Sequence, residues 1–457
     1  MAGRKAFAAL VAAGLGTLAP AAWADTANPA PQSPEATTIV PQVLGNQKHA
    51  DPWQPLIDRG IRLALNYTGE AAANPVGGDR QDAAYAGQVY MGVDLDMGKL
   101  AGIHGAGLHF AVTNRHGDNL AQTALGNNTS VQEIWGTQNT HLAILTWEQS
   151  FLNDHLTIEA GKSQANIHFL TSPLYCNFQS NSACGNPTLV FKDSNFTYFP
   201  ASSWMAKARV QFDRHWFAHA GIYEVNPNRK RATDDGFSLS FKGGTGFIVP
   251  FEVGYGSDAK TDRLPRHYIL GGWVDRGTYA DPISDAAGGI ALLTGSAPAT
   301  HKGRAGLYVR FDQMLTRPDP KSDRGLTLFG VAMANVSGRV EESHYFELGL
   351  VQTGTFHGRD RDTLGFMIND QHFSDLAVSR MSAGQIAGGG TGRVHRDEIM
   401  MELAYGLQLG DALRLSPNVQ YIVHPDQSGV PFRATNVPDA LVFGFKFTVD
   451  AMKLIPR

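Results

Sequence analysis

Residues 441–449 read LVFGFKFTV, and this stretch repeats with a period of two. Alternate residues are large and apolar, whereas the residues between them include a glycine and the charged Lys446. A period of two is typical of a β-strand, because successive side chains point to opposite faces of the sheet. The stretch therefore predicts a strand with two unlike faces and leaves open which face meets water. The apolar residues are Leu441, Phe443, Phe445, Phe447 and Val449.

The chain has 457 residues, which is enough for one large architecture or two domains. Lys and Arg number 38 against 42 Asp and Glu, so the charge balance gives no reason to expect a nucleic-acid partner. The 50 glycines favour turns and close backbone approach over long helices.

The N-terminus has the pattern of a secretory signal peptide. Arg4 and Lys5 precede an apolar run over residues 6–18, and Ala22-Trp23-Ala24 provides a cleavage site of the small-x-small type. We expect residues 1–24 to be removed during export and residues 25–52, rich in Pro, Ala, Gln and Thr, to form a flexible leader. No later segment has the roughly 18 consecutive apolar residues of a spanning helix, so membrane residence would have to use strands.

Two cysteines, Cys176 and Cys184, lie eight residues apart in the sequence. In an exported chain a close pair of this kind is most simply a disulfide that closes a small loop. The spacing offers no set of His and Cys ligands for zinc, and we expect neither a metal nor another cofactor.

From residue 61 onward, segments of roughly ten residues alternate apolar with small or polar side chains. Sixteen of them satisfy two rules for transmembrane barrels, an even strand number and alternation of long loops with short turns. A seventeenth segment, residues 237–242, breaks this alternation, and we place it inside a long loop. The predicted strands are 61–70, 86–96, 106–115, 139–148, 155–162, 204–213, 216–225, 246–256, 267–275, 304–314, 325–335, 344–354, 362–372, 396–409, 412–424 and 439–449.

The face opposite the apolar residues carries small and charged side chains, such as Lys207 and Arg209 on one strand and Arg310 and Asp312 on another. A Lys or Arg facing lipid near mid-depth costs roughly 2–4 kcal/mol, so this face must turn toward an aqueous interior. A sixteen-stranded barrel leaves such a channel. The sequence therefore predicts an all-β, sixteen-stranded antiparallel transmembrane barrel with long extracellular loops and short periplasmic turns, and Lys446 is expected to point into its water.

Several segments in order along the chain resemble the carbohydrate-selective porins of the OprB type. The resemblance runs from about Trp53 to Ala451 and implies a porin barrel over residues 53–457, an outer-membrane location in a Gram-negative bacterium, and passive diffusion of small sugars. The chain departs from the common pattern of an aromatic last residue, because it continues past Phe447 to MKLIPR. The segments are WQPLIDRGIRLALNYTGEAAANPVGG, YCNFQSNSACG, GLYVRFDQMLTRPD, GLTLFGVAMANVSG, ELGLVQTGTFHGRDRDTLGF and ELAYGLQLGDALRLSPNVQYIVHP.

A pore selective for sugars needs donors and acceptors that replace hydration, and aromatic faces for the C–H surfaces of the ring. We expect residues 163–203, which carry both cysteines, to fold into the pore and set its narrowest point. Tyr90 joins Trp273 and Tyr308 as a possible stacking surface. The residues predicted to line the pore are Arg62, Asn66, Arg115, Lys207, Arg209, Trp273, Tyr308, Arg310, Asp312, Glu402 and Lys446.

Other functions remain open at this stage. A general or anion-preferring diffusion porin fits the same barrel, and so does a barrel-embedded or soluble exported protein that binds glycans. An enzyme is disfavoured, because the sequence contains neither a G-x-S-x-G nucleophile motif nor an H-E-x-x-H metal motif, and we expect no catalytic residue. The expected partners are outer-membrane lipid and small carbohydrates, with monomer and homotrimer both allowed.

Overall fold

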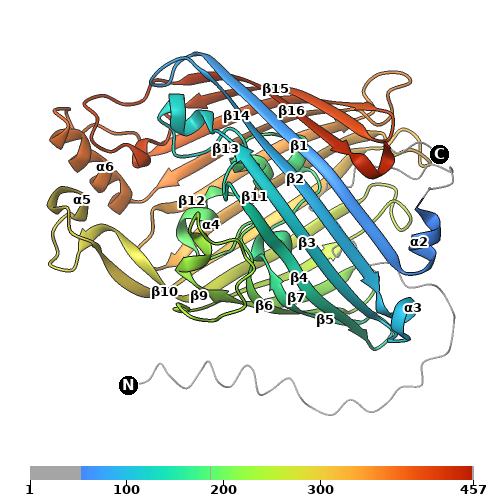
Figure 1. Ribbon diagram of the computed structural model, residues 1–457. Coiled ribbons are helices and arrows are strands. Elements are labelled where there is room, and N and C mark those ends of the chain that lie inside the picture. The colour runs from blue at the N-terminus through green and yellow to red at the C-terminus, as the bar shows by residue number, and fades with distance from the viewer. Residues whose placement is uncertain (1–52, 186, 455–457) are drawn as a thin grey trace. The chain divides into compact units, whose positions relative to one another are not determined.

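Sixteen antiparallel strands close into one barrel in the computed structural model, which describes residues 53–185 and 187–454. Each strand pairs with its neighbours in sequence, and β1 pairs with β16 to close the barrel (Figure 1). The fold class predicted from the sequence is confirmed. The predicted signal peptide and leader, residues 1–24 and 25–52, lie outside the described residues.

The strands are β1 (Ile61–Val76), β2 (Ala83–Asp96), β3 (Ala106–Gly117), β4 (Thr140–Phe151), β5 (Leu156–Ser163), β6 (Ser203–Gln211), β7 (Trp216–Val225), β8 (Gly246–Gly256), β9 (Arg266–Asp285), β10 (Pro298–Thr316), β11 (Gly325–Ser337), β12 (Glu342–Thr353), β13 (Thr363–Phe373), β14 (Asp397–Leu409), β15 (Leu413–Val423) and β16 (Ala440–Asp450). The helices are short, and all but α2, which precedes β1, lie between strands: α2 (Gln54–Asp58), α3 (Met97–Ala101), α4 (Thr188–Asp193), α5 (Ala291–Thr294) and α6 (Asp375–Ala387). None of the helices in the described part of the chain is long and apolar enough to cross a membrane.

The long loops all lie at one end of the barrel, as the sequence predicts, although two connections at that end, 77–82 and 338–341, are short. We call the end with the loops 118–139, 164–202, 226–245, 374–396 and 424–439 the long-loop rim, and the opposite end the short-turn rim. Residues 237–242 form no strand and lie inside the loop 226–245, as expected.

Two hairpins are longer than the periodicity predicts. β1 and β2 leave only residues 77–82 between them, where the sequence suggested a loop over 71–85. The alanines at the end of β1 are a weak strand signal, but they pair with the phenylalanines of β16, Ala71 with Phe445 and Ala73 with Phe443. Pairing across the barrel seam therefore overrides the local preference of these residues.

The β9–β10 hairpin also extends well beyond its predicted strands, over most of the segment 276–303 that the sequence suggested as a loop. Polar pairs connect the two arms of this extension. His301 Nε2 lies 2.7 Å from Asp281 Oδ2, and Arg304 Nε lies 3.0 Å from Asp275 Oδ2.

The apolar face of the strands points outward, and the charged face points into the barrel. On β16, Phe443 is 52% exposed and Phe445 is 41% exposed, whereas Lys446 keeps only 7% of its surface. A soluble sandwich would show the reverse, because its apolar face would form a dry core. The inside-out orientation inferred from the charged faces of the strands is therefore confirmed, and LVFGFKFTV follows it.

The C-terminal tail turns back onto the barrel at the short-turn rim. After β16 the chain makes one turn of 3₁₀-helix over residues Ala451–Lys453, and Trp53 Nε1 donates a hydrogen bond of 2.9 Å to the carbonyl of Met452. The two ends of the described chain therefore meet beside the seam between β1 and β16.

Candidate functional site

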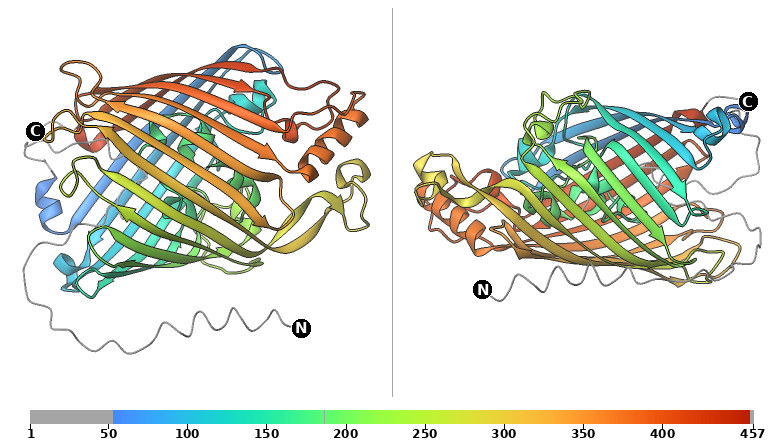
Figure 2. Two further views of the ribbon diagram at one scale, coloured as in Figure 1. Left: turned by 180° about the vertical axis from the view of Figure 1, so that it is seen from behind. Right: turned by 90° about the horizontal axis from the view of Figure 1, so that it is seen from below.

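Residues 164–202, here called the lumen segment, leave β5 at the long-loop rim and fold into the barrel before β6. The backbone N–H groups of Gln179 and Ser180 donate to the two carboxylate oxygens of Glu402 on β14, at 2.7 and 3.0 Å. Tyr345 on β12 donates to the carbonyl of Ser182 at 2.8 Å. Figure 2 shows the green ribbon of this segment within the ring of strands. The segment thus crosses the interior and docks on the far wall, as the sequence suggested.

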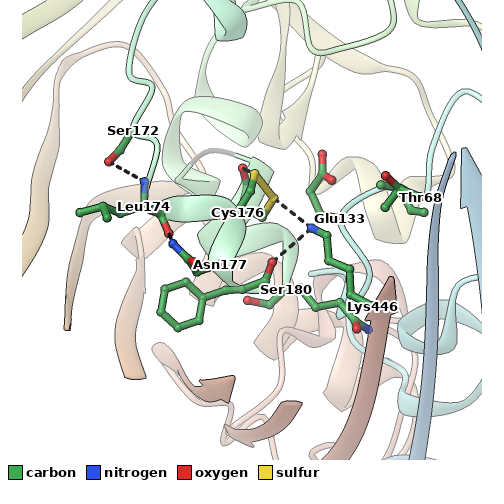
Figure 3. The surroundings of a disulfide bond; sticks show 12 residues. Thr68, Glu133, Ser172, Leu174, Cys176, Asn177, Ser180 and Lys446 are labelled. Atoms are coloured by element: carbon green, nitrogen blue, oxygen red, sulfur yellow. Dashed lines mark hydrogen bonds between the residues drawn. A yellow bond between two sulfur atoms is a disulfide. The ribbon is translucent and has the colours of Figure 1, made fainter. Parts of the chain in front are cut away.

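The predicted disulfide joins Cys176 to Cys184 within the lumen segment (Figure 3). Lys446 lies beside it, and its ammonium group donates to the carbonyl of Phe178 at 3.3 Å and to Cys184 Sγ at 3.5 Å. The same ammonium lies 3.2 Å from Glu70 Oε1 on β1. Lys446 therefore points inward as predicted but meets the lumen segment rather than open water.

A second loop, residues 118–139, packs against the lumen segment inside the barrel. Glu133 N donates to the carbonyl of Gln179 at 3.0 Å, and Asn181 N donates to the carbonyl of Ser130 at 3.0 Å. Gln132 Nε2 in turn donates to the backbone of Glu70 on β1 at 2.8 Å. The two loops together occupy the interior in front of β12 to β16 and β1.

Arg115 on β3 contacts several polar and aromatic groups on the side of the interior that faces β12 to β14. Its Nε donates to Gln88 Oε1 at 2.7 Å, and its Nη2 lies 3.9 Å from Glu133 Oε1. The guanidinium carbon is 5.6 Å from the ring centre of Phe199, which is 6.2 Å from the ring centre of Tyr90. These five residues, the Arg115 cluster, combine donors, acceptors and ring faces at one place. Gln88, Tyr90 and Glu133 retain partial exposure, whereas Arg115 and Phe199 are buried at the back of the cluster.

Lys207 and Arg209 on β6 lie on the same side of the interior as the Arg115 cluster. Lys207 Nζ lies 3.3 Å from Glu159 Oε2 and donates to His168 Nδ1 at 3.1 Å. The guanidinium of Arg209 is 4.0 Å from the ring centre of Phe217, and this side chain is half-buried. Inward charges on β5 and β6 are thus paired with one another or held over a ring.

The two large aromatic residues expected to offer stacking surfaces are covered instead. Trp273 is 0% exposed and its ring lies 6.2 Å from that of Phe196 in the lumen segment. Tyr308 is 2% exposed and donates to Glu252 Oε1 at 2.6 Å. Their strand parity is inward as predicted, but the lumen segment packs over them, so a solute in the lumen cannot stack on either ring.

The remaining predicted pore residues also differ in how far they are exposed to the lumen. Arg310 and Asp312 are buried and paired at 3.4 Å. Glu402 is buried and accepts hydrogen bonds from the backbone of the lumen segment. Arg62 is exposed, and Asn66 on the same strand is largely buried. Inward position therefore does not by itself make a residue accessible.

Sequence reasoning missed three members of the Arg115 cluster, namely Gln88, Glu133 and Phe199. Gln88 shares the inward parity of Tyr90 on β2, so its signal was present in the alternation. Glu133 and Phe199 come from loops, where no periodicity indicates a direction. Only the docking of both loops brings them to Arg115.

Comparisons with known proteins agree with this architecture. The family model described as "Carbohydrate-selective porin, OprB family" matches residues 80–450. Porin B of Pseudomonas aeruginosa is 30% identical over 406 residues, covering 86% of this chain and 87% of that protein. The high-pH structure of Pseudomonas putida OprB superposes with a TM-score of 0.78 at 29% identity, covering 87% of this chain and 95% of that one. The chain belongs to the OprB family of carbohydrate-selective porins, a family of bacterial outer-membrane β-barrels.

Proposed function

We propose that small carbohydrates diffuse through this barrel along the wall formed by β2 to β6, and that the Arg115 cluster sets their narrowest passage. The observation that carries the proposal is the convergence of Arg115, Gln88 and Glu133 with the rings of Tyr90 and Phe199. A sugar loses water from its hydroxyls in a narrow passage, and these side chains supply donors and acceptors in exchange.

The pairing of Arg115 limits how tightly a sugar is held. Its guanidinium is buried with Gln88 and Glu133 as partners, so a sugar hydroxyl meets the partly exposed Gln88 and Glu133 and competes with their contacts to Arg115. Passage requires binding that favours entry yet allows release. A paired arginine beside aromatic rings meets both requirements better than an isolated buried charge.

The route into the membrane is the second part of the proposal. Residues 1–24 act as a cleaved signal peptide, and the outward apolar wall then faces outer-membrane lipid, with the long-loop rim outside the cell and the short-turn rim in the periplasm. Passive diffusion through the barrel needs no cofactor, no metal and no catalytic residue. The proposed sugar transport takes place within one barrel and is the same for a monomer and for a homotrimer.

Liposome swelling tests the function directly. Proteoliposomes of the purified chain should swell quickly with monosaccharides and disaccharides and more slowly with organic acids of similar size. Arg115→Gln should slow sugar entry several-fold, because the buried guanidinium no longer positions Gln88 and Glu133, the partly exposed groups of the passage. The matched control is Arg324→Gln, since Arg324 lies in the turn 317–324 at the short-turn rim. Equal swelling rates for all small solutes would instead indicate a general diffusion porin, and faster entry of anions an anion-preferring one.

A further inference from the structure

A second aromatic pair lies inside the barrel, outside the Arg115 cluster. Phe191 is 51% exposed, and its ring centre is 5.0 Å from that of Tyr198 with the two planes inclined at 69°. Both residues belong to the lumen segment, and Phe191 is the exposed residue of helix α4. An exposed ring on a surface needs no explanation, but this one is carried into the interior by a docked segment.

Helix α4 is attached to the inner side of the barrel wall by the residues around Phe191. Thr188 Oγ1 donates to Glu342 Oε2 at 3.0 Å, and Lys192 Nζ lies 2.7 Å from Glu342 Oε1. Asp193 accepts hydrogen bonds of 2.7 Å from the backbone N–H groups of Glu341 and Glu342. Since these contacts hold the helix to the start of β12, Phe191 lies near the long-loop rim.

The stretch between the two rings is held equally firmly. Asn195 Nδ2 donates to Asp275 Oδ2 at 2.9 Å, and its backbone N–H donates to the same oxygen at 3.0 Å. Asp275 on β9 is paired in turn with Arg304 on β10 at 3.0 Å. The rings of Phe191 and Tyr198 therefore sit on a backbone that is ordered before any solute arrives, which reduces the entropy cost of binding.

The chain itself links this aromatic pair to the narrow passage. Tyr198 is followed directly by Phe199, whose ring lies beside Arg115 and Tyr90. A solute that enters from the long-loop rim meets Phe191 first and reaches the Arg115 cluster by moving along the lumen segment. Phe191 is the exposed ring at the outer end of this path, and the partly exposed Tyr90 is the ring at the inner end, because Phe199 is buried.

We infer that Phe191 and Tyr198 form an outer docking site for the pyranose rings of carbohydrates, separate from the Arg115 cluster and ahead of it on the path inward. This inference rests on the proposed function. The C–H face of a pyranose ring covers an aromatic face without losing hydroxyl hydration, so the site holds a sugar weakly and lets it move on. Chains of several pyranose units bind more tightly than a single unit, because one unit contacts Phe191 and Tyr198 while the next reaches the Arg115 cluster.

Single-channel recording with a linear glucose oligomer of six units tests the inference. The full chain is placed in a planar bilayer, and the oligomer is added on the long-loop side. Phe191→Ala should shorten the blocking events by about 2- to 10-fold, the range expected for loss of one aromatic contact. Conductance in potassium chloride should stay unchanged, because no charge is altered. Phe191→Trp should restore or lengthen the events.

Phe432→Ala is the matched control, because Phe432 is 55% exposed in a different loop of the long-loop rim. It should leave the blocking events unchanged. If Phe191→Ala blocks like the unmodified protein while Arg115→Gln loses block, the outer site is disproved and the proposed function stands. If the unmodified protein shows no block by any sugar and no sugar swelling, the proposed function fails as well. Heat-dependent gel migration verifies that each variant forms the barrel.

Discussion

The inward faces of the two sides of the barrel carry similar residue types but meet different surroundings. On β8 to β16, Trp273, Tyr308, Arg310 and Lys446 lie beneath the lumen segment. On β2 to β4, the inward Gln88, Tyr90, Asp94, His109 and Glu148 retain partial exposure. The first side, here called the covered side, holds the lumen segment. We propose that the second side, here called the open side and extending to the half-buried Arg209 on β6, meets the solute.

This difference shows that the direction of a side chain and its accessibility have different causes. Alternation along a strand determines whether a side chain points in or out, because the period is fixed by backbone geometry. Which inward residues stay accessible depends on where a loop docks, and that is decided by contacts between residues far apart in sequence. Substitutions on the covered side should thus act on stability and pore closure, and those on the open side on selectivity.

The largest effect is expected at Lys192, which fastens the lumen segment to the covered side. Its ammonium lies 2.7 Å from Glu342 Oε1 and 2.7 Å from Asp426 Oδ2, and both carboxylates are fully buried. Lys192→Met leaves them unpaired, which should lower the free energy of unfolding by about 3–5 kcal/mol. Denaturant titration followed by gel migration measures this, and open-channel current noise should rise as the segment loosens.

Lys260→Met is the matched control for Lys192→Met, because Lys260 is exposed in a turn of the short-turn rim. It should change neither the unfolding midpoint nor the noise. An unchanged midpoint for Lys192→Met would mean that the ion pairs do not fasten the segment.

The disulfide should contribute the next largest effect. Cys176 and Cys184 are eight residues apart, and closing so short a loop stabilises the fold by about 2–3 kcal/mol in the chain-entropy account. The double variant Cys176→Ser, Cys184→Ser should unfold at lower denaturant concentration and show more frequent current fluctuations. Addition of a reductant to the unmodified chain should reproduce both changes, and the double variant should not respond to it.

Two arginines test the contrast between the sides most directly. Arg310 is buried and paired with Asp312, so Arg310→Gln should cost about 1–3 kcal/mol of stability and leave ion preference unchanged. Arg209 is half-buried on β6, so Arg209→Gln should reduce anion preference and sugar flux while changing stability by less than about 0.5 kcal/mol. Reversal potentials and unfolding midpoints of both variants are compared. The reverse assignment of effects would contradict the division into covered and open sides.

The sequence predicts the direction of strand side chains well, but it does not predict which of them the loops cover. Sixteen strands, the alternation of loop lengths and the inward direction of Lys446 all follow from a period-two pattern that each strand carries by itself. The burial of Trp273 does not, because it depends on Phe196, 77 residues earlier in the chain. Phe199 and Glu133 join Arg115 only when two loops fold inward, and neither loop has a periodic signal.

The smallest expected effect is that of pH on the Lys192 attachment. The Lys192 ammonium holds the pKa of Asp426 below its usual 3.8 against the opposing effect of burial, and the paired carboxylates raise the pKa of Lys192 above its usual 10.5. A lowered carboxyl pKa gives stability that is present above 3.8 and lost as the pH falls through the folded-state value. A raised ammonium pKa gives stability that is present below 10.5 and lost only at higher pH.

Current noise and sugar block should therefore stay constant between pH 5 and pH 9, and the noise should rise only at a pH below 3.8, where the folded chain's Asp426, whose pKa is lowered, takes up a proton. Asp426→Asn should show the raised noise at every pH, because its side chain cannot ionise and the ion pair with Lys192 is absent from the start. A steady rise of noise from pH 7 to pH 5 in the unmodified chain would mean that groups other than Lys192 and Asp426 determine how firmly the lumen segment is attached. His109 on β3 and His168 in the lumen segment, each close to a carboxylate, would then be the first residues to substitute.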